Sequence, residues 1–83
     1  MELMKFYADW CAPCKAVSTL LQQEDRLKNI KLIEVDIDEY LSAVTEFRVK
    51  SIPTLILFDE NGKELRRLSG NITPTNLDNF LNP

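Results

Sequence analysis

The sequence predicts a single α/β domain in which helices cover a mixed β-sheet. Two observations lead to this prediction. The hydrophobic pattern changes several times between short apolar runs and helical spacing, as it does in chains that mix strands and helices. The chain has only 83 residues, which is too few to build two hydrophobic cores, so residues 1–83 are expected to form one domain.

The first half of the chain is predicted to contain two strands and two helices. The apolar run Leu3–Ala8 predicts a buried strand, and Pro13–Leu27 predicts a helix with one apolar face and a proline in its first turn. Lys31–Asp38 alternates apolar and polar residues, which is typical of a strand. Glu39–Phe47 predicts a short helix whose inner face includes Leu41. A helix between the two strands makes them a parallel pair with a right-handed crossover.

The second half is predicted to form a hairpin and a last helix. Thr54–Phe58 is almost continuously apolar and is expected to be a central strand. Asn61-Gly62 is a strong signal for a tight turn, so Lys63–Leu68 returns as an antiparallel partner at the sheet edge. Thr73 is suited to cap a helix that has Pro74 in its first position. The predicted element order is β-α-β-α-β-β-α.

Composition excludes several kinds of site. The absence of histidine excludes Ser-His-Asp and Cys-His catalytic groups. Two cysteines are too few for a structural zinc site and two glycines provide no phosphate-binding loop, so no metal, nucleotide or flavin is expected. A net charge of -3 argues against nucleic acid, and no apolar run is long enough to cross a membrane. The N-terminal residues lack the pattern of a signal peptide, which predicts a cytoplasmic, reducing location.

The two cysteines are the residues most clearly suited to chemistry. Cys11 and Cys14 lie where the first strand ends and the first helix begins. Unpaired N–H groups and the helix dipole stabilise a thiolate there, so Cys11 is expected to be the exposed nucleophile and Cys14 the protected resolving thiol. Trp10 supplies an apolar wall and Lys15 a nearby positive charge. The alternatives are two buried structural cysteines, or half of a metal site shared with a partner.

These residues give the sequence a resemblance to the thioredoxin family. The resemblance rests on the stretch Ala8–Lys15 and on Ser51-Ile52-Pro53-Thr54, and it extends through Leu55–Phe58, Asn61-Gly62 and Gly70. It implies a thioredoxin-like fold with three helices and a four-stranded mixed sheet of order 2-1-3-4. Thioredoxins usually have one more strand and helix before the strand that leads into the cysteines, so their absence here makes the second strand an edge.

The resemblance also implies an activity. The chain is expected to be a protein-disulfide reductase in which Cys11 attacks a substrate disulfide and Cys14 releases the reduced product. Its expected partners are disulfide-containing proteins and a thioredoxin reductase or an equivalent reductase, and a monomer is the expected state. The reversible disulfide of Cys11 and Cys14 is the redox group, so the chemistry needs no cofactor.

A substrate-binding groove around Cys11 follows from the same resemblance. The residue matching Pro53 is a cis-proline that faces the cysteine pair in the family, and its turn leaves the backbone of Ile52 free to pair with an extended peptide. An ordinary proline at the start of a strand is the alternative. The residues expected to border the groove are Trp10, Ala12, Pro13, Ile52, Pro53, Gly70 and Asn71.

Lys5 and Glu34 depart from the family pattern. Thioredoxins usually have a buried aspartate six residues before the first cysteine and a lysine on the adjacent strand, and these positions here hold Lys5 and Glu34. Lys5 and Glu34 are expected to face each other beneath Cys14, with Glu34 as proton acceptor and donor. The alternative is that both side chains reach solvent and form a weak ion pair.

Three other functions are compatible with the same residues. A glutaredoxin-like enzyme would use glutathione, although Trp10 and Ala12-Pro13 favour a thioredoxin role. A non-catalytic binding module would use the fold alone, although such modules often lose a cysteine and this chain keeps both. A disulfide oxidant would have the same site with a different reduction potential.

Overall fold

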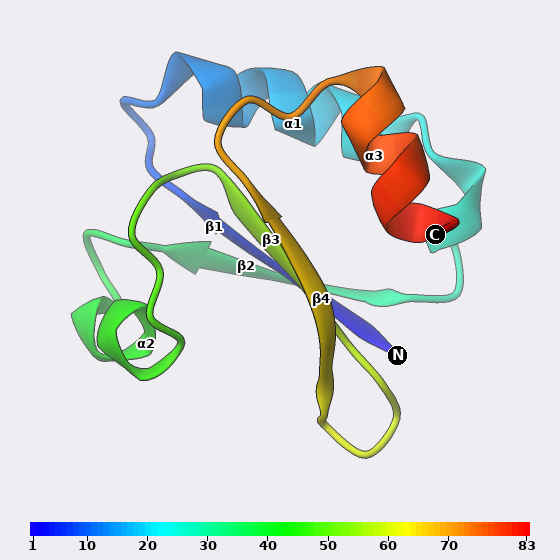
Figure 1. Cartoon of the computed structure of the whole chain (residues 1–83). Coiled ribbons are helices and arrows are strands. Elements are labelled where there is room, and N and C mark those ends of the chain that lie inside the picture. Colours follow the sequence, from blue (N-terminus) through cyan, green and yellow to red (C-terminus); the bar gives the residue numbers. More distant parts are fainter.

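The sheet has four strands in the order β2-β1-β3-β4 (Figure 1). A computed structural model describes residues 1–83. β1 pairs in parallel with β2 and antiparallel with β3, and β3 pairs antiparallel with β4. The predicted fold class and strand order are therefore confirmed. The strands are β1 (Glu2–Tyr7), β2 (Lys31–Asp36), β3 (Thr54–Phe58) and β4 (Glu64–Ser69).

Helices cover both faces of this sheet. The helical segments are α1 (Ala12–Gln22), η1 (Asp25–Leu27), α2 (Leu41–Glu46) and α3 (Pro74–Leu81). α1 and α3 lie on one face and α2 lies on the other (Figure 1). None of them combines the length and apolar character that a membrane-spanning helix requires.

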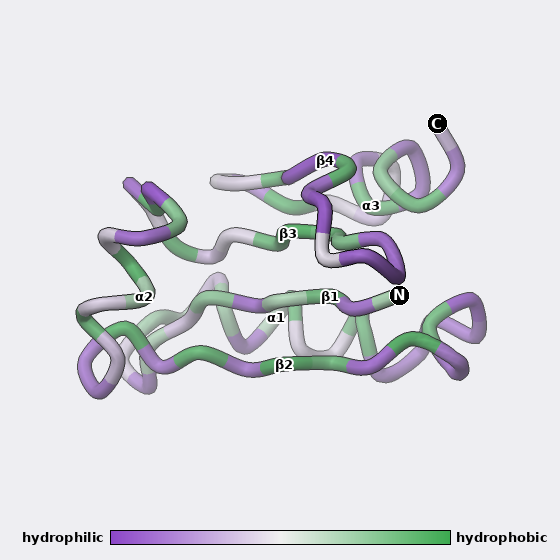
Figure 2. Tube along the Cα trace, turned by 90° about the horizontal axis from the view of Figure 1, so that it is seen from below, coloured by the Kyte–Doolittle hydropathy of each residue, from purple (hydrophilic) through white to green (hydrophobic).

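β3 holds the two layers together because all five of its residues are buried. Leu55 and Leu57 pack with α1 and α3, whereas Ile56 and Phe58 pack on the α2 side. Figure 2 shows that the chain is hydrophobic along much of β3 and hydrophilic in the turn that follows it. That turn contains Gly62 at a φ of 83°, a conformation that favours glycine and accounts for the Asn-Gly signal.

Two predicted elements end earlier than the sequence pattern suggested. α1 ends at Gln22 because the Glu24 carboxylate accepts a hydrogen bond from the N–H of Arg26, at 3.1 Å, and starts the separate helix η1. β2 ends at Asp36, whose carboxylate accepts from the N–H of Asp38 at 2.9 Å and turns the chain.

One expectation about the core is wrong. Leu41 was expected to face inward, but it is 69% exposed. α2 has only six residues, so its first residue can lie beyond the contact with the sheet. Val44 and Phe47, further along the same segment, do pack against the apolar cluster of Phe6 and Phe58.

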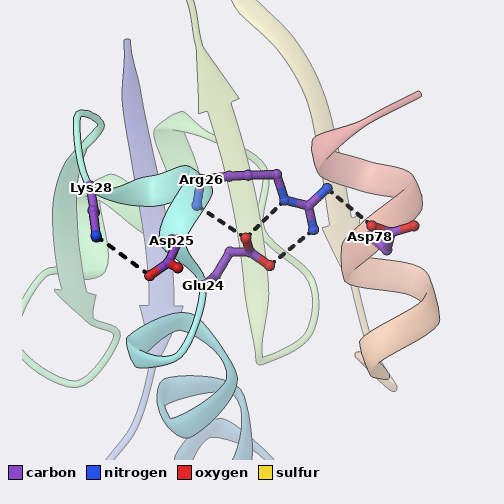
Figure 3. A network of polar contacts seen from close by, with 5 residues as sticks. All are labelled: Glu24, Asp25, Arg26, Lys28 and Asp78. Carbon is purple, nitrogen blue, oxygen red and sulfur yellow. Dashed lines mark hydrogen bonds and ion pairs between the residues drawn. The ribbon is translucent and has the colours of Figure 1, made fainter.

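A polar network joins η1 to α3 (Figure 3). The Arg26 guanidinium donates to both Glu24 carboxylate oxygens, at 2.8 and 2.9 Å, and lies 3.0 Å from the Asp78 carboxylate. The hydrogen bonds from Arg26 lower the pKa of Glu24 to about 2. The neighbouring pair of Lys28 and Asp25 is longer, at 3.8 Å, largely exposed and confined to η1 and the residue after it. Arg26 is therefore the residue that connects the two helices.

Replacing Arg26 by alanine should lower the free energy of unfolding at pH 7 and make that loss depend on pH. Because the pKa of Glu24 is lower in the folded state, its ionised carboxylate stabilises that state at pH values above the ordinary pKa of 4.5. This contribution is lost as the pH falls toward 2. Urea denaturation of both proteins between pH 7 and pH 2 should therefore show the difference shrinking with acid. Lys28→Ala is the control, with little change at any pH. A loss of unfolding free energy in R26A that is equal at pH 7 and pH 2 would contradict the prediction.

Candidate functional site

Cys11 and Cys14 form a disulfide at the N-terminus of α1. Cys11 is the N-cap residue, and its sulfur accepts a hydrogen bond from the N–H of Cys14 at 3.2 Å. The N–H of Cys11 in turn donates to the carbonyl of Ala8 at 3.1 Å, which ties the cysteine to the end of β1. After reduction, the same amide and the positive end of the helix dipole stabilise a thiolate at Cys11.

The structure corrects one expectation about the cysteines. Cys11 was expected to be exposed, yet in this oxidised form it is only 5% exposed, and Cys14 is 2% exposed. The disulfide draws both sulfurs into a small cluster with Ala8, against which Ile37 and Ile52 pack. The expected division of roles, with Cys11 attacking and Cys14 resolving, stays a prediction.

Ile52, the residue before Pro53, lies against the cysteine pair. The Ile52–Pro53 peptide bond is cis, as the resemblance implied. Ile52 packs on the cysteine cluster, and the carbonyl of Pro53 accepts from the N–H of Gly70 at 3.1 Å. Gly70 has a φ of 84°, which favours glycine. Three distant segments of the predicted groove are thereby connected, and Asn71 follows as an exposed residue.

A hollow of about 270 Å³ lies beside the disulfide on the α2 side. Trp10 and Ile52 line it, together with Ile37 and Val49, which the sequence did not single out. The remaining predicted groove residues are not part of this hollow. Ala12 and Pro13 are exposed in the first turn of α1, whereas Pro53 is buried.

Asp38 contacts the candidate site, and sequence reasoning did not single it out. The Trp10 side chain is 69% exposed, and its indole N–H donates to the Asp38 carboxylate at 2.9 Å. This bond holds a large apolar ring in the open beside the cysteines. From sequence, Asp38 was only one of several charges on an edge strand. Its position just beyond the carboxyl end of β2, where β1 also delivers the cysteines, was the signal available.

The structure brings Lys5 and Glu34 together. They are direct partners in the pairing of β1 with β2, and the Lys5 ammonium lies 3.0 Å from the Glu34 carboxylate. The alternative in which both side chains reach solvent is wrong for Lys5, whose side chain is 4% exposed, while that of Glu34 is 52% exposed. Ser18, which was not singled out, accepts a hydrogen bond from Lys5 at 2.6 Å. The proton-transfer role of Glu34 stays a prediction.

A disulfide at the N-terminus of a helix is suited to exchange with other thiols and disulfides. The fold and site thus define a thiol-disulfide oxidoreductase. The sequence model of the Thioredoxin family matches residues 1–83. The chain therefore belongs to the thioredoxin family.

Relatives and solved structures agree with this assignment. A thioredoxin of Haemophilus influenzae is 33% identical over 82 residues, which cover 96% of this chain and 76% of the relative. The thioredoxin-like protein slr0233 of Synechocystis is 34% identical over 70 residues, which cover 82% of this chain and 66% of the relative. The chain thus spans about two thirds to three quarters of these relatives.

The structural comparison gives the same result. Trxlp from Edwardsiella tarda superposes with a TM-score of 0.83 at 35% identity, covering 99% of this chain and 82% of that one. Oxidised mitochondrial thioredoxin 3 from Saccharomyces cerevisiae gives 0.81 at 27% identity, covering 96% of this chain and 74% of that one.

Asp38→Ala should raise the KM for a protein disulfide about threefold and leave kcat unchanged, because loss of one hydrogen bond frees the Trp10 ring without touching the cysteines. Steady-state reduction of insulin measures both constants. Glu60→Ala, at an exposed position in the β3–β4 turn, is the matched control and should behave like the unaltered protein. An unchanged KM in the Asp38 variant would show that the bond does not position the ring for substrate.

Proposed function

We propose that this chain reduces disulfide bonds of proteins in a reducing compartment, the cytoplasm, and acts as a monomer. The observation that carries the proposal is the capping of α1 by Cys11, whose sulfur accepts the N–H of Cys14. That N–H group stabilises the attacking thiolate of Cys11 after the disulfide is reduced. A monomer suffices for this role, because a single copy already brings Cys11, Ile52 and Trp10 close together.

The reaction consists of two exchanges that balance in atoms and electrons. The Cys11 thiolate attacks one sulfur of the substrate disulfide, forms a mixed disulfide and expels the other sulfur as a thiolate. The Cys14 thiol loses its proton and attacks Cys11, which forms the internal disulfide and releases the second substrate sulfur. The substrate gains two electrons and the cysteine pair loses two. A recycling reductase returns them.

The substrate is proposed to be an extended segment that crosses the surface around Cys11. Trp10 offers an exposed apolar ring beside a hollow, and Ile52 lies at the border between that hollow and the cysteines. The backbone of Ile52, next to a proline that has no N–H, is suited to pair with such a segment. The other proposed contacts are Ala12, Pro13, Pro53, Gly70 and Asn71.

Cys14→Ser should accumulate a mixed disulfide between Cys11 and the substrate, because the attacking thiolate remains and the resolving thiol is gone. Mass spectrometry after incubation with oxidised insulin, under non-reducing conditions, detects the adduct. Cys11→Ser is the matched control and should form little adduct and reduce no insulin. A Cys11→Ser protein that still reduces insulin would overturn the assignment of Cys11 as the attacking thiol.

Recycling separates a thioredoxin role from a glutaredoxin role. With catalytic amounts of this chain, NADPH and a thioredoxin reductase should sustain insulin reduction faster than glutathione with glutathione reductase. The exposed Trp10 beside Ala12-Pro13 is the basis of that expectation, since it offers a protein partner a broad apolar contact. NADPH consumption at equal concentrations compares the two systems. Faster turnover with glutathione would identify a glutaredoxin-like enzyme instead.

A further inference from the structure

Lys5 is the one charged residue among the buried residues of this chain. It lies on an inner strand and faces the α1 side of the sheet, where its ammonium donates to the Ser18 hydroxyl at 2.6 Å. The ammonium also pairs with Glu34 at 3.0 Å and lies 5.3 Å from the centre of the Tyr7 ring. A buried ammonium needs such partners, because leaving water is unfavourable for an unpaired charge.

The ammonium is connected to the resolving cysteine and not to the attacking one. Ser18, which accepts from Lys5, donates its own hydroxyl hydrogen to the carbonyl of Cys14 at 3.2 Å. Lys5, Ser18, Cys14 and Glu34 also line one cavity of about 140 Å³, which Cys11 does not reach. This cavity is large enough to admit water, so a proton that leaves Cys14 has a route to solvent.

The other titratable groups around the cavity are Tyr7, Asp9, Lys15 and Glu34. Burial, followed by the charge of Asp36, raises the pKa of Tyr7, so this side chain is neutral near pH 7. Asp9 and Lys15 are exposed and Glu34 is half exposed, so water screens their fields. The buried ammonium is screened least, and its field at Cys14 is therefore positive.

We propose that Lys5 is a positioning residue that stabilises the Cys14 thiolate, and that it thereby favours the reduced form of the cysteine pair. The thiolate forms when Cys14 gives its proton to water in the cavity and attacks the mixed disulfide at Cys11. Glu34 opposes this effect, because its negative charge partly cancels the ammonium that it pairs with. This inference rests on the proposed function only for one step, the attack of Cys14 on the mixed disulfide.

The role predicted for Glu34 from sequence gives the opposite result for one variant. If Glu34 accepted the Cys14 proton, Glu34→Gln would slow release of the mixed disulfide. If Lys5 acts through its charge, Glu34→Gln leaves that charge less compensated and makes the Cys14 thiolate easier to form. The two variants Lys5→Met and Glu34→Gln should therefore shift the equilibrium between the disulfide and the reduced cysteine pair in opposite directions.

Equilibration with glutathione measures that shift without any protein substrate. Lys5→Met should favour the disulfide over the reduced pair by up to about tenfold once the pH is high enough to ionise Cys14 fully, and by less at pH 6. Glu34→Gln should favour the reduced pair by about threefold, and Lys5→Arg should resemble the unaltered protein. Lys31→Met, which removes an exposed lysine from β2, the edge strand that also carries Glu34, is the matched control.

A second readout follows Cys14 directly. In a Cys11→Ser background, ultraviolet absorbance of the thiolate gives the Cys14 pKa, which Lys5→Met should raise by about one unit. Glu34 is half exposed, so its variant remains informative even if Lys5→Met does not fold. Shifts of the same sign in both variants, or none beyond that of Lys31→Met, would overturn the proposal. Because glutathione alone is used, failure to reduce proteins would leave this result unaffected.

Discussion

The pairing of β1 on both of its edges is the constraint on which the rest of the structure depends. β1 lies between β2 and β3, so both of its edges are hydrogen-bonded, and side chains from the helices pack on both of its faces. Leu3 packs with α1 and α3, and Phe6 packs on the α2 side. The strand can run in only one register that buries both residues. That register fixes where β1 ends, and hence where the cysteines enter α1.

The same register forces a charge into the interior. Lys5 is two residues from Leu3 and therefore shares its face, which is the buried α1 face. Glu34 is its direct partner on β2, and because β2 is an edge strand this carboxylate remains half in solvent. The pair is thus asymmetric, with a buried cation and an accessible anion. An ion pair of this kind acts on its surroundings mainly through the member that water does not screen.

The redox site is assembled on the side of the sheet where β1 ends and the antiparallel β3 begins. The β1–α1 junction brings Cys11, and the segment before β3 brings Ile52 against it, followed by the cis-proline Pro53. A backbone hydrogen bond from Gly70 attaches the segment after β4. Each segment adjoins a strand of the hydrogen-bonded sheet, so the site lies on a rigid frame although its own residues are in turns.

The sequence by itself determined the elements of this fold and the chemistry of its cysteines. Alternating or continuous apolar runs, the Asn-Gly turn and the cap at Thr73 act between neighbouring residues, and the structure has them where expected. The motifs around Cys11 and Pro53 were also readable, since they are short and local.

Only the tertiary structure decided the contacts between residues far apart in the chain. Trp10 with Asp38, Lys5 with Ser18, and Arg26 with Asp78 are all such contacts. Local pattern also failed where packing or side-chain hydrogen bonds competed with it, as in the early end of α1 and the burial of Cys11. The reason is physical: hydrogen bonds between distant side chains depend on how helices and strands pack, which no local periodicity specifies.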